Sequence, residues 1–138
     1  MIKVAETNEE FVNCFKVLSA LRPHLDLEEF LSRLVRMSES TGYRLAYLHE
    51  NGIKAVAGFR MSEWLHTGKY LEIEEFTTKE EERSKGYGGK LFDWALGYAK
   101  DHGCKQVRLV SGVSRDRAHK FYLSKGMAFE AKYFSIDV

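Results

Sequence analysis

Two stretches of the sequence hold residues whose types and spacing could do chemistry. The first, RSKGYGGK, runs from Arg83 to Lys90 and combines three glycines with basic residues on both sides. If this stretch opens a helix, backbone N–H groups without helical partners converge at the positive end of the helix dipole. Glycine lets the backbone approach a phosphate closely, so the stretch is a candidate anion site. It matches neither GxxxxGK[ST] nor GxGxxG, and taken alone a tight turn with solvated lysines is the simpler interpretation.

The second stretch is acidic and directly precedes the first. Leu71 and Ile73 alternate as the inward-facing residues of a strand should, but the next large apolar residue is Phe76. The alternation therefore slips by one residue near Glu74 and Glu75. A β-bulge would explain the slip, and bulges turn backbone N–H and C=O groups toward ligands. A strand that ends at Ile73 explains the pattern equally well.

Length and composition indicate one domain that spans residues 1–138. The 138 residues are 44% hydrophobic and 30% charged, which is enough for one real core. The formal net charge is +1 and the basic residues are spread along the chain, so we expect no nucleic-acid partner.

The cysteines and the apolar runs exclude several classes of protein. Cys14 and Cys104 lie in apolar stretches without CxxC spacing, which argues against a zinc site or a disulfide framework and favours buried thiols. The first residues lack the apolar core of a signal peptide, and no apolar run approaches the ~18 residues that span a bilayer. We therefore expect a cytoplasmic protein with no membrane partner.

The elements that must position these residues are predicted in the order βααβββαβαβ. Thr7 with Glu10, and later Asp26 with Glu29, are helix-start signals, and Asn51-Gly52 is a hairpin signal. The predicted strands cover residues 2–6, 43–49, 53–60, 69–78 and 105–110, and a closing strand forms the final residues. The predicted helices lie before Pro23, after Asp26, from the glycine stretch to Gly103, and over residues 115–125 up to Gly126.

A third stretch of the sequence also holds residues whose types and spacing are informative. SGVSRDRAHKFYLSKGM, residues 111–127, places Ala118, Phe121 and Tyr122 on one helix that stops at Gly126. Over its full length the chain resembles the GNAT superfamily of N-acetyltransferases. Its Arg-x-x-Gly-x-Gly run from Arg83 looks like that family's acyl-coenzyme A pyrophosphate loop, and Ala-x-x-Phe-Tyr-x-x-x-Gly looks like its second motif. The chain is most similar to a bacterial branch with LRPHL near the start, and more distantly to the aminoalkylphosphonate acetyltransferases.

The resemblance implies a fold and a donor site. The fold would be an α/β (α+β) one, with a mixed, mostly antiparallel central sheet and helices on both faces. The strand around the suspected bulge would present its backbone to the pantetheine arm of acetyl-coenzyme A. The residues that the resemblance assigns to the donor are Phe76, Thr77, Thr78, Arg83, Ser84, Lys85, Gly86, Tyr87, Gly88, Gly89, Arg115, Ala118 and Phe121. Arg115 departs from the family, which mostly has asparagine there, so it either meets a phosphate or an acidic substrate or faces solvent.

The resemblance also implies catalytic residues. Tyr122 matches the tyrosine that protonates the departing thiolate. The alternative is a purely structural role, as a core tyrosine on an apolar helix face. An amine nucleophile must lose a proton, and Glu72 or Glu74, which share one face of a strand, is the candidate base. Glu75 stays open as a third carboxylate. Further candidates on the substrate side are Arg22, His24, Trp64, His66 and Lys69. Nothing in the spacing of His24 and His66 demands a metal.

The leading hypothesis is an enzyme that moves an acetyl group from acetyl-coenzyme A to a small-molecule or peptide amine by direct attack in a ternary complex, without a metal. The alternative is a GNAT-like sensor or partner domain that holds acyl-coenzyme A without efficient turnover. An unrelated α/β domain with another phosphate ligand is a third hypothesis. A homodimer is expected from what is common in the family.

Overall fold

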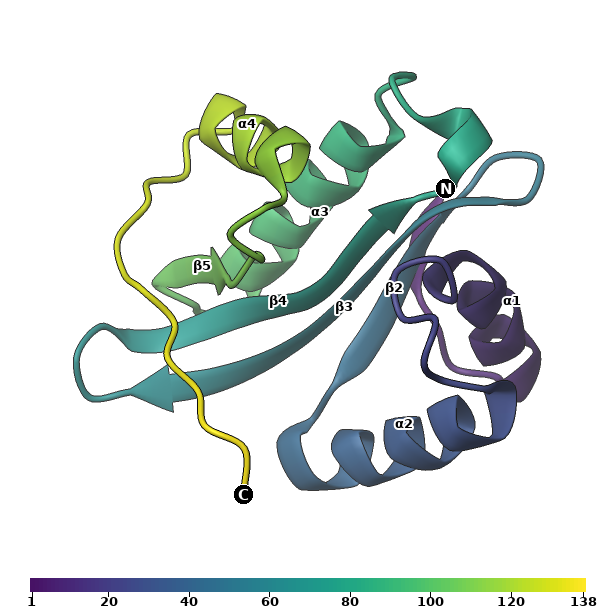
Figure 1. Cartoon of the computed structure of the whole chain (residues 1–138), viewed down its shortest axis with the longest axis horizontal. Coiled ribbons are helices and arrows are strands. Elements are labelled where there is room, and N and C mark those ends of the chain that lie inside the picture. The colour runs from purple at the N-terminus through teal and green to yellow at the C-terminus, as the bar shows by residue number, and fades with distance from the viewer. The chain divides into compact units, whose positions relative to one another are not determined.

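The computed structural model describes residues 1–138 and contains a five-stranded sheet in the order β1-β2-β3-β4-β5 (Figure 1). The strands are β1 Ile2–Val4, β2 Arg44–His49, β3 Ile53–Trp64, β4 Gly68–Thr78 and β5 Gln106–Leu109. The helices are α1 Asn8–Leu18, α2 Leu27–Thr41, the short 3-10 helix η1 Glu80–Glu82, α3 Tyr87–Asp101 and α4 Asp116–Ser124. The chain divides into two compact parts, Met1–Arg108 and Leu109–Val138, which are described separately below.

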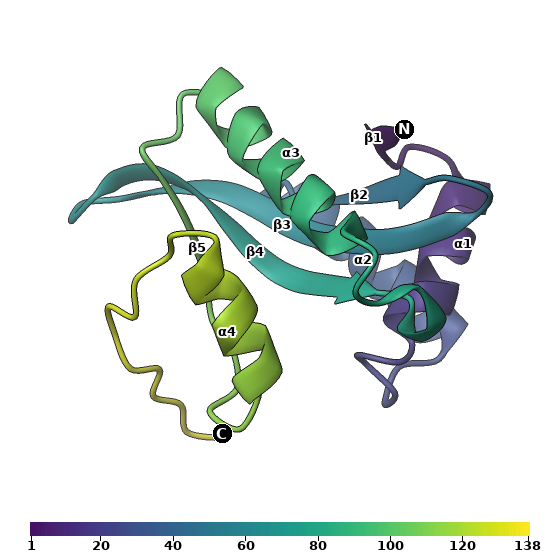
Figure 2. The same ribbon diagram turned by 90° about the horizontal axis from the view of Figure 1, so that it is seen from above.

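The first part is a sheet with helices on both faces, as the sequence predicts. Strands β1 to β4 pair antiparallel in chain order, and β5 lies beside β4 after the crossover through α3. Helices α1 and α2 lie on one face, and α3 runs across the other face over β3 and β4 (Figures 1 and 2). No helix combines the length and hydropathy required to span a bilayer.

Local chemistry explains where the first elements begin and turn. Thr7 and Glu10 form the predicted capping box, because each side chain bonds the other residue's backbone N–H. Asp26 likewise accepts a hydrogen bond from the N–H of Glu29 at the start of α2. Asn51 and Gly52 have φ values of 56° and 96°, the positive range that a type I′ hairpin needs. All three turn and cap predictions are confirmed.

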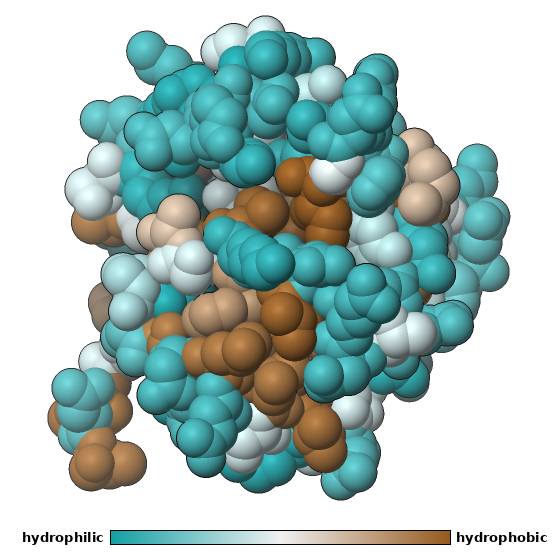
Figure 3. Space-filling view, turned by 90° about the vertical axis from the view of Figure 1, so that its right-hand side faces the viewer, coloured by the Kyte–Doolittle hydropathy of each residue, from teal (hydrophilic) through white to brown (hydrophobic).

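The core of the first part lies between the sheet and its helices. The largest fully buried side chains are Phe59, Phe92, Leu45, Leu71, Leu91, Val56 and Cys14. Cys14 is therefore the buried thiol that was predicted, whereas Cys104 is only partly buried, and both are free. On the outer side of α1 and α2, hydrophobic residues gather in the middle of a hydrophilic face (Figure 3). Phe11, Phe15 and Leu31 are partly buried and pack against the core cluster of the first part.

The end of the chain differs from the prediction. No strand follows α4, and the side chains of Phe129, Tyr133, Phe134 and Ile136 are exposed. The apolar pattern of this segment changes parity between Tyr133 and Phe134, so no single face of a regular strand collects these side chains. A smaller difference concerns β3, which runs to Trp64 and so extends beyond its predicted end at residue 60.

The register of β3 and β4 contains a bulge, which is one of the two interpretations that the sequence left open. Gly58 pairs with Glu75 and Phe59 pairs with Ile73, so Glu74 is the extra residue of β4. Gly58 also leaves space that the side chain of Tyr43 occupies. A Cβ atom at position 58 would lie 1.8 Å from the hydroxyl oxygen of Tyr43 and 2.7 Å from a carboxylate oxygen of Glu75. The missing side chain thus lets Tyr43 donate a hydrogen bond to Glu75 across the strand.

We predict that Gly58→Ala lowers the free energy of unfolding by about 1–3 kcal/mol, because the added methyl group overpacks a filled site. Urea unfolding followed by circular dichroism measures the change. Gly97→Ala in α3 is the matched control, since a Cβ there meets nothing within 4 Å. It should leave stability unchanged or raise it by up to about 1 kcal/mol. Equal midpoints for Gly58→Ala and the wild type would contradict the close approach.

Candidate active site

Three carboxylates of β4 lie at or beside the bulge, and each has different partners. The carboxylate of Glu72 lies 2.8 Å from Arg108 Nε and 3.7 Å from Arg60 Nη2. The carboxylate of Glu74 lies 2.9 Å from Arg60 Nε. Glu72 and Glu74 therefore share Arg60, as expected for residues on one face of the strand. Arg60 and Arg108 were not recognised from the sequence as partners of the glutamates.

The third carboxylate, Glu75, is held from the opposite direction. Its Oε2 lies 3.2 Å from Arg22 Nη2, and its Oε1 accepts the hydrogen bond of Tyr43. Arg22 Nη2 also donates to the backbone carbonyl oxygen of Glu74 over 3.1 Å. One arginine thus ties the loop between α1 and α2 to the bulge. The predicted substrate-side residue Arg22 is here, but Tyr43 was missed, because only Gly58 inside a strand hinted that another group approaches closely.

The environment separates the three carboxylates electrostatically. Burial raises the pKa of the Glu74 carboxyl, and the neighbouring charge of Glu75 raises it further, while Arg60 opposes both effects. Glu72, by contrast, has two arginine partners, and Arg108 is itself stacked between rings. The Arg108 guanidinium lies 3.7 Å from the ring centre of Tyr70 and 4.6 Å from that of Trp64. The environment of Glu74 therefore favours its protonated form more than water would.

The edge of β4 that faces β5 extends beyond its neighbour. Strand β4 has 11 residues and β5 has four, so β5 pairs only part of that edge. The N–H of Lys105 donates to the carbonyl oxygen of Lys69 over 2.7 Å, which places β5 near the start of β4. Phe76, Thr77 and Thr78, at the other end of β4, pair with β3 on their inner side. A ligand chain could therefore run along their outer side and bond the backbone as a strand would.

The glycine stretch forms the start of α3, as predicted. Gly86 is the N-cap residue with φ 87° and supplies no side-chain cap. The first intrahelical hydrogen bond of α3 runs from the N–H of Lys90 to the carbonyl oxygen of Gly86, so the preceding amides have no partner within the helix. A Cβ at Gly86 or Gly89 would meet nothing within 4 Å. Open space, oriented amides and the helix dipole together suit an anion.

Basic side chains beside this stretch are held by one glutamate. The Glu82 carboxylate lies 3.0 Å from Lys54 Nζ and 2.9 Å from Lys85 Nζ. These contacts lower the pKa of Glu82, and the contact with Glu82 raises the pKa of Lys85. The predicted donor residues Arg83 and Ser84 are exposed in the same connection.

The second part of the chain holds the remaining predicted residues. Tyr122 on α4 is buried, with 9% of its surface exposed, and burial raises the pKa of its phenol. The positive charge of Arg115 opposes that rise, which places Arg115 near the hydroxyl. Ala118 and Phe121 are partly buried, and the Phe121 ring lies 5.6 Å from that of Tyr122. A phenol with a raised pKa keeps its proton and remains a donor.

The two candidate histidines are not brought into a metal site. His24 lies in the loop after α1, whereas the ring of His66 lies 5.3 Å from that of Trp64 at the β3–β4 turn. No cluster of three or more histidine, cysteine or acidic residues could hold a metal ion. Lys69, the other candidate at that turn, donates to the carbonyl oxygen of His102 over 2.6 Å.

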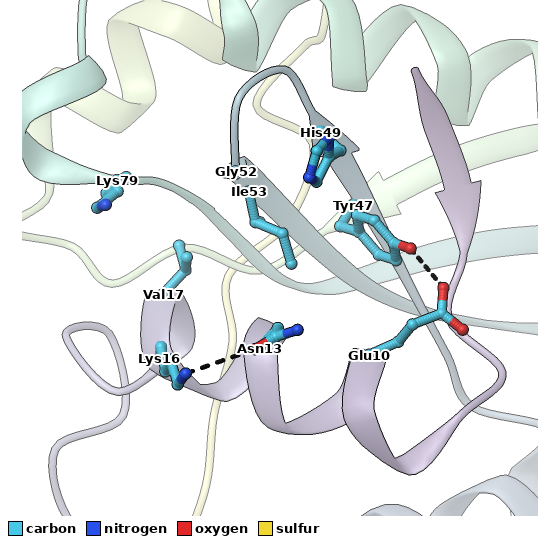
Figure 4. A pocket seen from close by; sticks show the side chains of 9 residues that line it. All are labelled: Glu10, Asn13, Lys16, Val17, Tyr47, His49, Gly52, Ile53 and Lys79. Carbon is cyan, nitrogen blue, oxygen red and sulfur yellow. Dashed lines mark hydrogen bonds between the residues drawn. The ribbon is translucent and has the colours of Figure 1, made fainter.

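A cavity of about 330 Å³ lies between α1 and the β2–β3 hairpin (Figure 4). Figure 4 shows Glu10 and Tyr47 pointing toward one another, and their hydrogen bond lowers the pKa of Glu10 to about 2. Lys16 turns toward Asn13 on the same helix. None of the predicted catalytic or donor-binding residues lines this cavity, so it is separate from the candidate site.

Comparisons with known proteins agree with this geometry. Residues 5–129 match the acetyltransferase (GNAT) family. An uncharacterized N-acetyltransferase of Bacillus subtilis, YhdJ, is 36% identical over 135 residues, which cover 96% of this chain and 95% of that protein. The aminoalkylphosphonate N-acetyltransferase of Salmonella typhimurium is 26% identical over 113 residues, or 80% of this chain and 73% of that protein.

Solved structures share the fold. A GNAT family acetyltransferase of Staphylococcus aureus superimposes with a TM-score of 0.80 and 21% sequence identity, over all of this chain and 98% of that one. The fold, the family match and the relatives point to the same conclusion. The chain belongs to the acetyltransferase (GNAT) family.

Proposed function

We propose that the protein is an N-acetyltransferase that moves an acetyl group from acetyl-coenzyme A to an amine by direct attack in a ternary complex. Enzymes of the family use acyl-coenzyme A as co-substrate and act on amine acceptors. The observation that carries the proposal is the continuity of the bulged strand β4 with the open, glycine-lined start of α3. The free edge of β4 suits an extended chain, and the start of α3 suits an anion. Coenzyme A contains an extended pantetheine arm and an anionic pyrophosphate.

The donor lies along these two elements in the proposal. The outer backbone of Phe76, Thr77 and Thr78 bonds the pantetheine arm. The amides between Ser84 and Gly89 receive the pyrophosphate at the positive end of α3, with Lys85 adding charge. Arg83, Tyr87, Arg115, Ala118 and Phe121 complete the donor-binding set that the family resemblance suggests.

The proposed reaction uses one base and one acid. Glu74 takes a proton from the ammonium of the acceptor, directly or through a water molecule, so that the nitrogen has a free lone pair. Glu72 beside it is the other candidate, but two arginines already contact its carboxylate. The nitrogen attacks the thioester carbonyl carbon, a C–N bond forms, and the C–S bond breaks as the tetrahedral intermediate collapses. Tyr122 gives its proton to the departing thiolate, and the products are an amide and free coenzyme A.

Several sequence-based expectations remain part of this proposal. They are one domain over residues 1–138, a cytoplasmic location, a homodimer, and acetyl as the acyl group.

We predict that Tyr122→Phe lowers kcat by about 100-fold, because a general acid contributes at least that much. Thiol release from acetyl-coenzyme A, measured with a panel of amines, gives the rate, and isothermal titration calorimetry gives the Kd of the donor. The substitution should leave the Kd of acetyl-coenzyme A unchanged. Tyr133→Phe, at a tyrosine that is 72% exposed, is the matched control. An unchanged rate for Tyr122→Phe would assign the proton donor to another group. If, in addition, the wild type binds acetyl-coenzyme A and acetylates no amine, the binding-domain alternative is favoured.

We also predict an acid limb in the pH profile of kcat/KM. The base must be deprotonated, so activity falls as the pH drops through the pKa of Glu74. Burial places that pKa above the ordinary glutamate value of about 4.3. Glu74→Gln should abolish the limb and lower kcat, whereas Glu63→Gln, at an exposed glutamate of β3, should change neither. Persistence of the limb in Glu74→Gln would assign the base to another group.

A further inference from the structure

A second cavity, of about 280 Å³, lies wholly within the first part of the chain. It opens between α1, the loop that follows α1, and α2, and one end of it reaches β4. Six apolar side chains line it: Phe15, Leu18, Leu25, Phe30, Leu34 and Met37. The rings of Phe15 and Phe30 lie 5.0 Å apart and form an aromatic wall. The volume suits a small molecule rather than a peptide segment.

The charged groups of the polar lining are paired, and Glu75 is the carboxylate among them that lines the cavity. Arg33 pairs with Glu29, which lies outside the cavity, over 2.7 Å. Arg22 pairs with Glu75. His24 lies exposed in the loop. The arginines of the lining are therefore already matched by carboxylates, so an anionic ligand would have to break an existing ion pair to find a partner.

Glu75 retains capacity for one further donor. Its Oε1 accepts from Tyr43, and its Oε2 accepts from Arg22 Nη2 and, over 3.4 Å, from Arg22 Nε. A carboxylate offers about four lone-pair sites, and this side chain is 17% exposed. An ammonium group brings three donors, and one of them could use a remaining lone pair of Glu75 beside Arg22.

The same end of the cavity adjoins the bulge. Glu75 follows Glu74 directly, and Arg22 bonds both the carboxylate of Glu75 and the backbone carbonyl oxygen of Glu74. An ammonium bound at Glu75 would therefore lie beside the carboxylate to which the proposed function assigns proton removal. The apolar part of the same molecule would extend away from the bulge into the cavity.

We propose that the acceptor is a primary amine on a compact hydrophobic group, an arylalkyl or branched alkyl amine, with its apolar group in this cavity and its ammonium at Glu75. The inference rests on the proposed function and names the substrate class of that site. The transfer is the one given above: the amine nitrogen gains the acetyl group and loses a proton to a carboxylate, and the thiolate leaves and is protonated. Glu75 binds the ammonium, Tyr43 and Arg22 position Glu75, and the apolar walls select the substituent.

Four amines of similar reactivity test the inference: 2-phenylethylamine, 3-methylbutylamine, ethanolamine and 2-aminoethylphosphonate. Thiol release from acetyl-coenzyme A gives kcat/KM for each. We expect the two hydrophobic amines to exceed ethanolamine and 2-aminoethylphosphonate by at least tenfold. Leu25→Gln, which puts a polar group of similar size on the cavity wall, should raise the KM for 2-phenylethylamine at least tenfold and leave the Kd of acetyl-coenzyme A unchanged. Leu65→Gln, at a fully exposed leucine of the β3–β4 turn, is the matched control and should change neither.

Glu75→Gln tests the other end of the cavity. It should raise the KM of every amine, because it removes the charge that binds the ammonium. Donor binding by calorimetry and the circular dichroism spectrum show whether the variant is folded. Glu63→Gln is its control.

The outcomes separate the two proposals. Equal or faster acetylation of ethanolamine or 2-aminoethylphosphonate, or an unchanged KM in Leu25→Gln, overturns the hydrophobic acceptor and leaves an acetyltransferase. Binding of acetyl-coenzyme A without acetylation of any amine overturns both proposals.

Discussion

The extra residue in β4 is the constraint on which the candidate site depends. In a regular strand, alternate side chains point to opposite faces, so the three glutamates could have only two environments. The bulge at Glu74 breaks that alternation, and it leaves Glu74 beside Arg60 while Glu75 meets Tyr43 and Arg22. Gly58 on the facing strand is required for this arrangement, because any side chain there would occupy the place of the Tyr43 hydroxyl.

The network around the bulge makes three identical functional groups chemically different. Glu72 is neutralised by two arginines, and Glu75 accepts from an arginine and a buried phenol. Glu74 has one arginine that it shares with Glu72, and burial together with the charge of Glu75 raises its pKa. The three carboxylates of one short segment therefore have different partners, which is the kind of environment in which proton-transfer groups are found. It also gives a physical reason for three arginines, each bonded to a glutamate of the strand.

Much of this arrangement could be predicted from local chemistry. The capping residues Thr7 and Asp26, the Asn51-Gly52 turn and the bulge near Glu74 all depend on neighbours a few residues apart, and all are present. The partners of the glutamates depend on folding, since Tyr43 is 32 residues from Glu75 and Arg22 is 53 residues from it. No repeating pattern in the sequence predicts which residues pair over such separations. The closing strand was predicted but does not form, and the apolar side chains after Gly126, such as those of Phe129 and Phe134, are exposed.

The central claim is that acetyl-coenzyme A lies along the end of β4 and across the start of α3. The most direct measurement is a titration of ¹⁵N-labelled protein with acetyl-coenzyme A, in which the shifts of backbone amide signals are followed by NMR. The account predicts that the largest shifts fall on residues 76–78 and 84–89. Largest shifts at the amides of the cavity between α1 and the β2–β3 hairpin, such as those of Asn13 and His49, or no shifts at all, would contradict it.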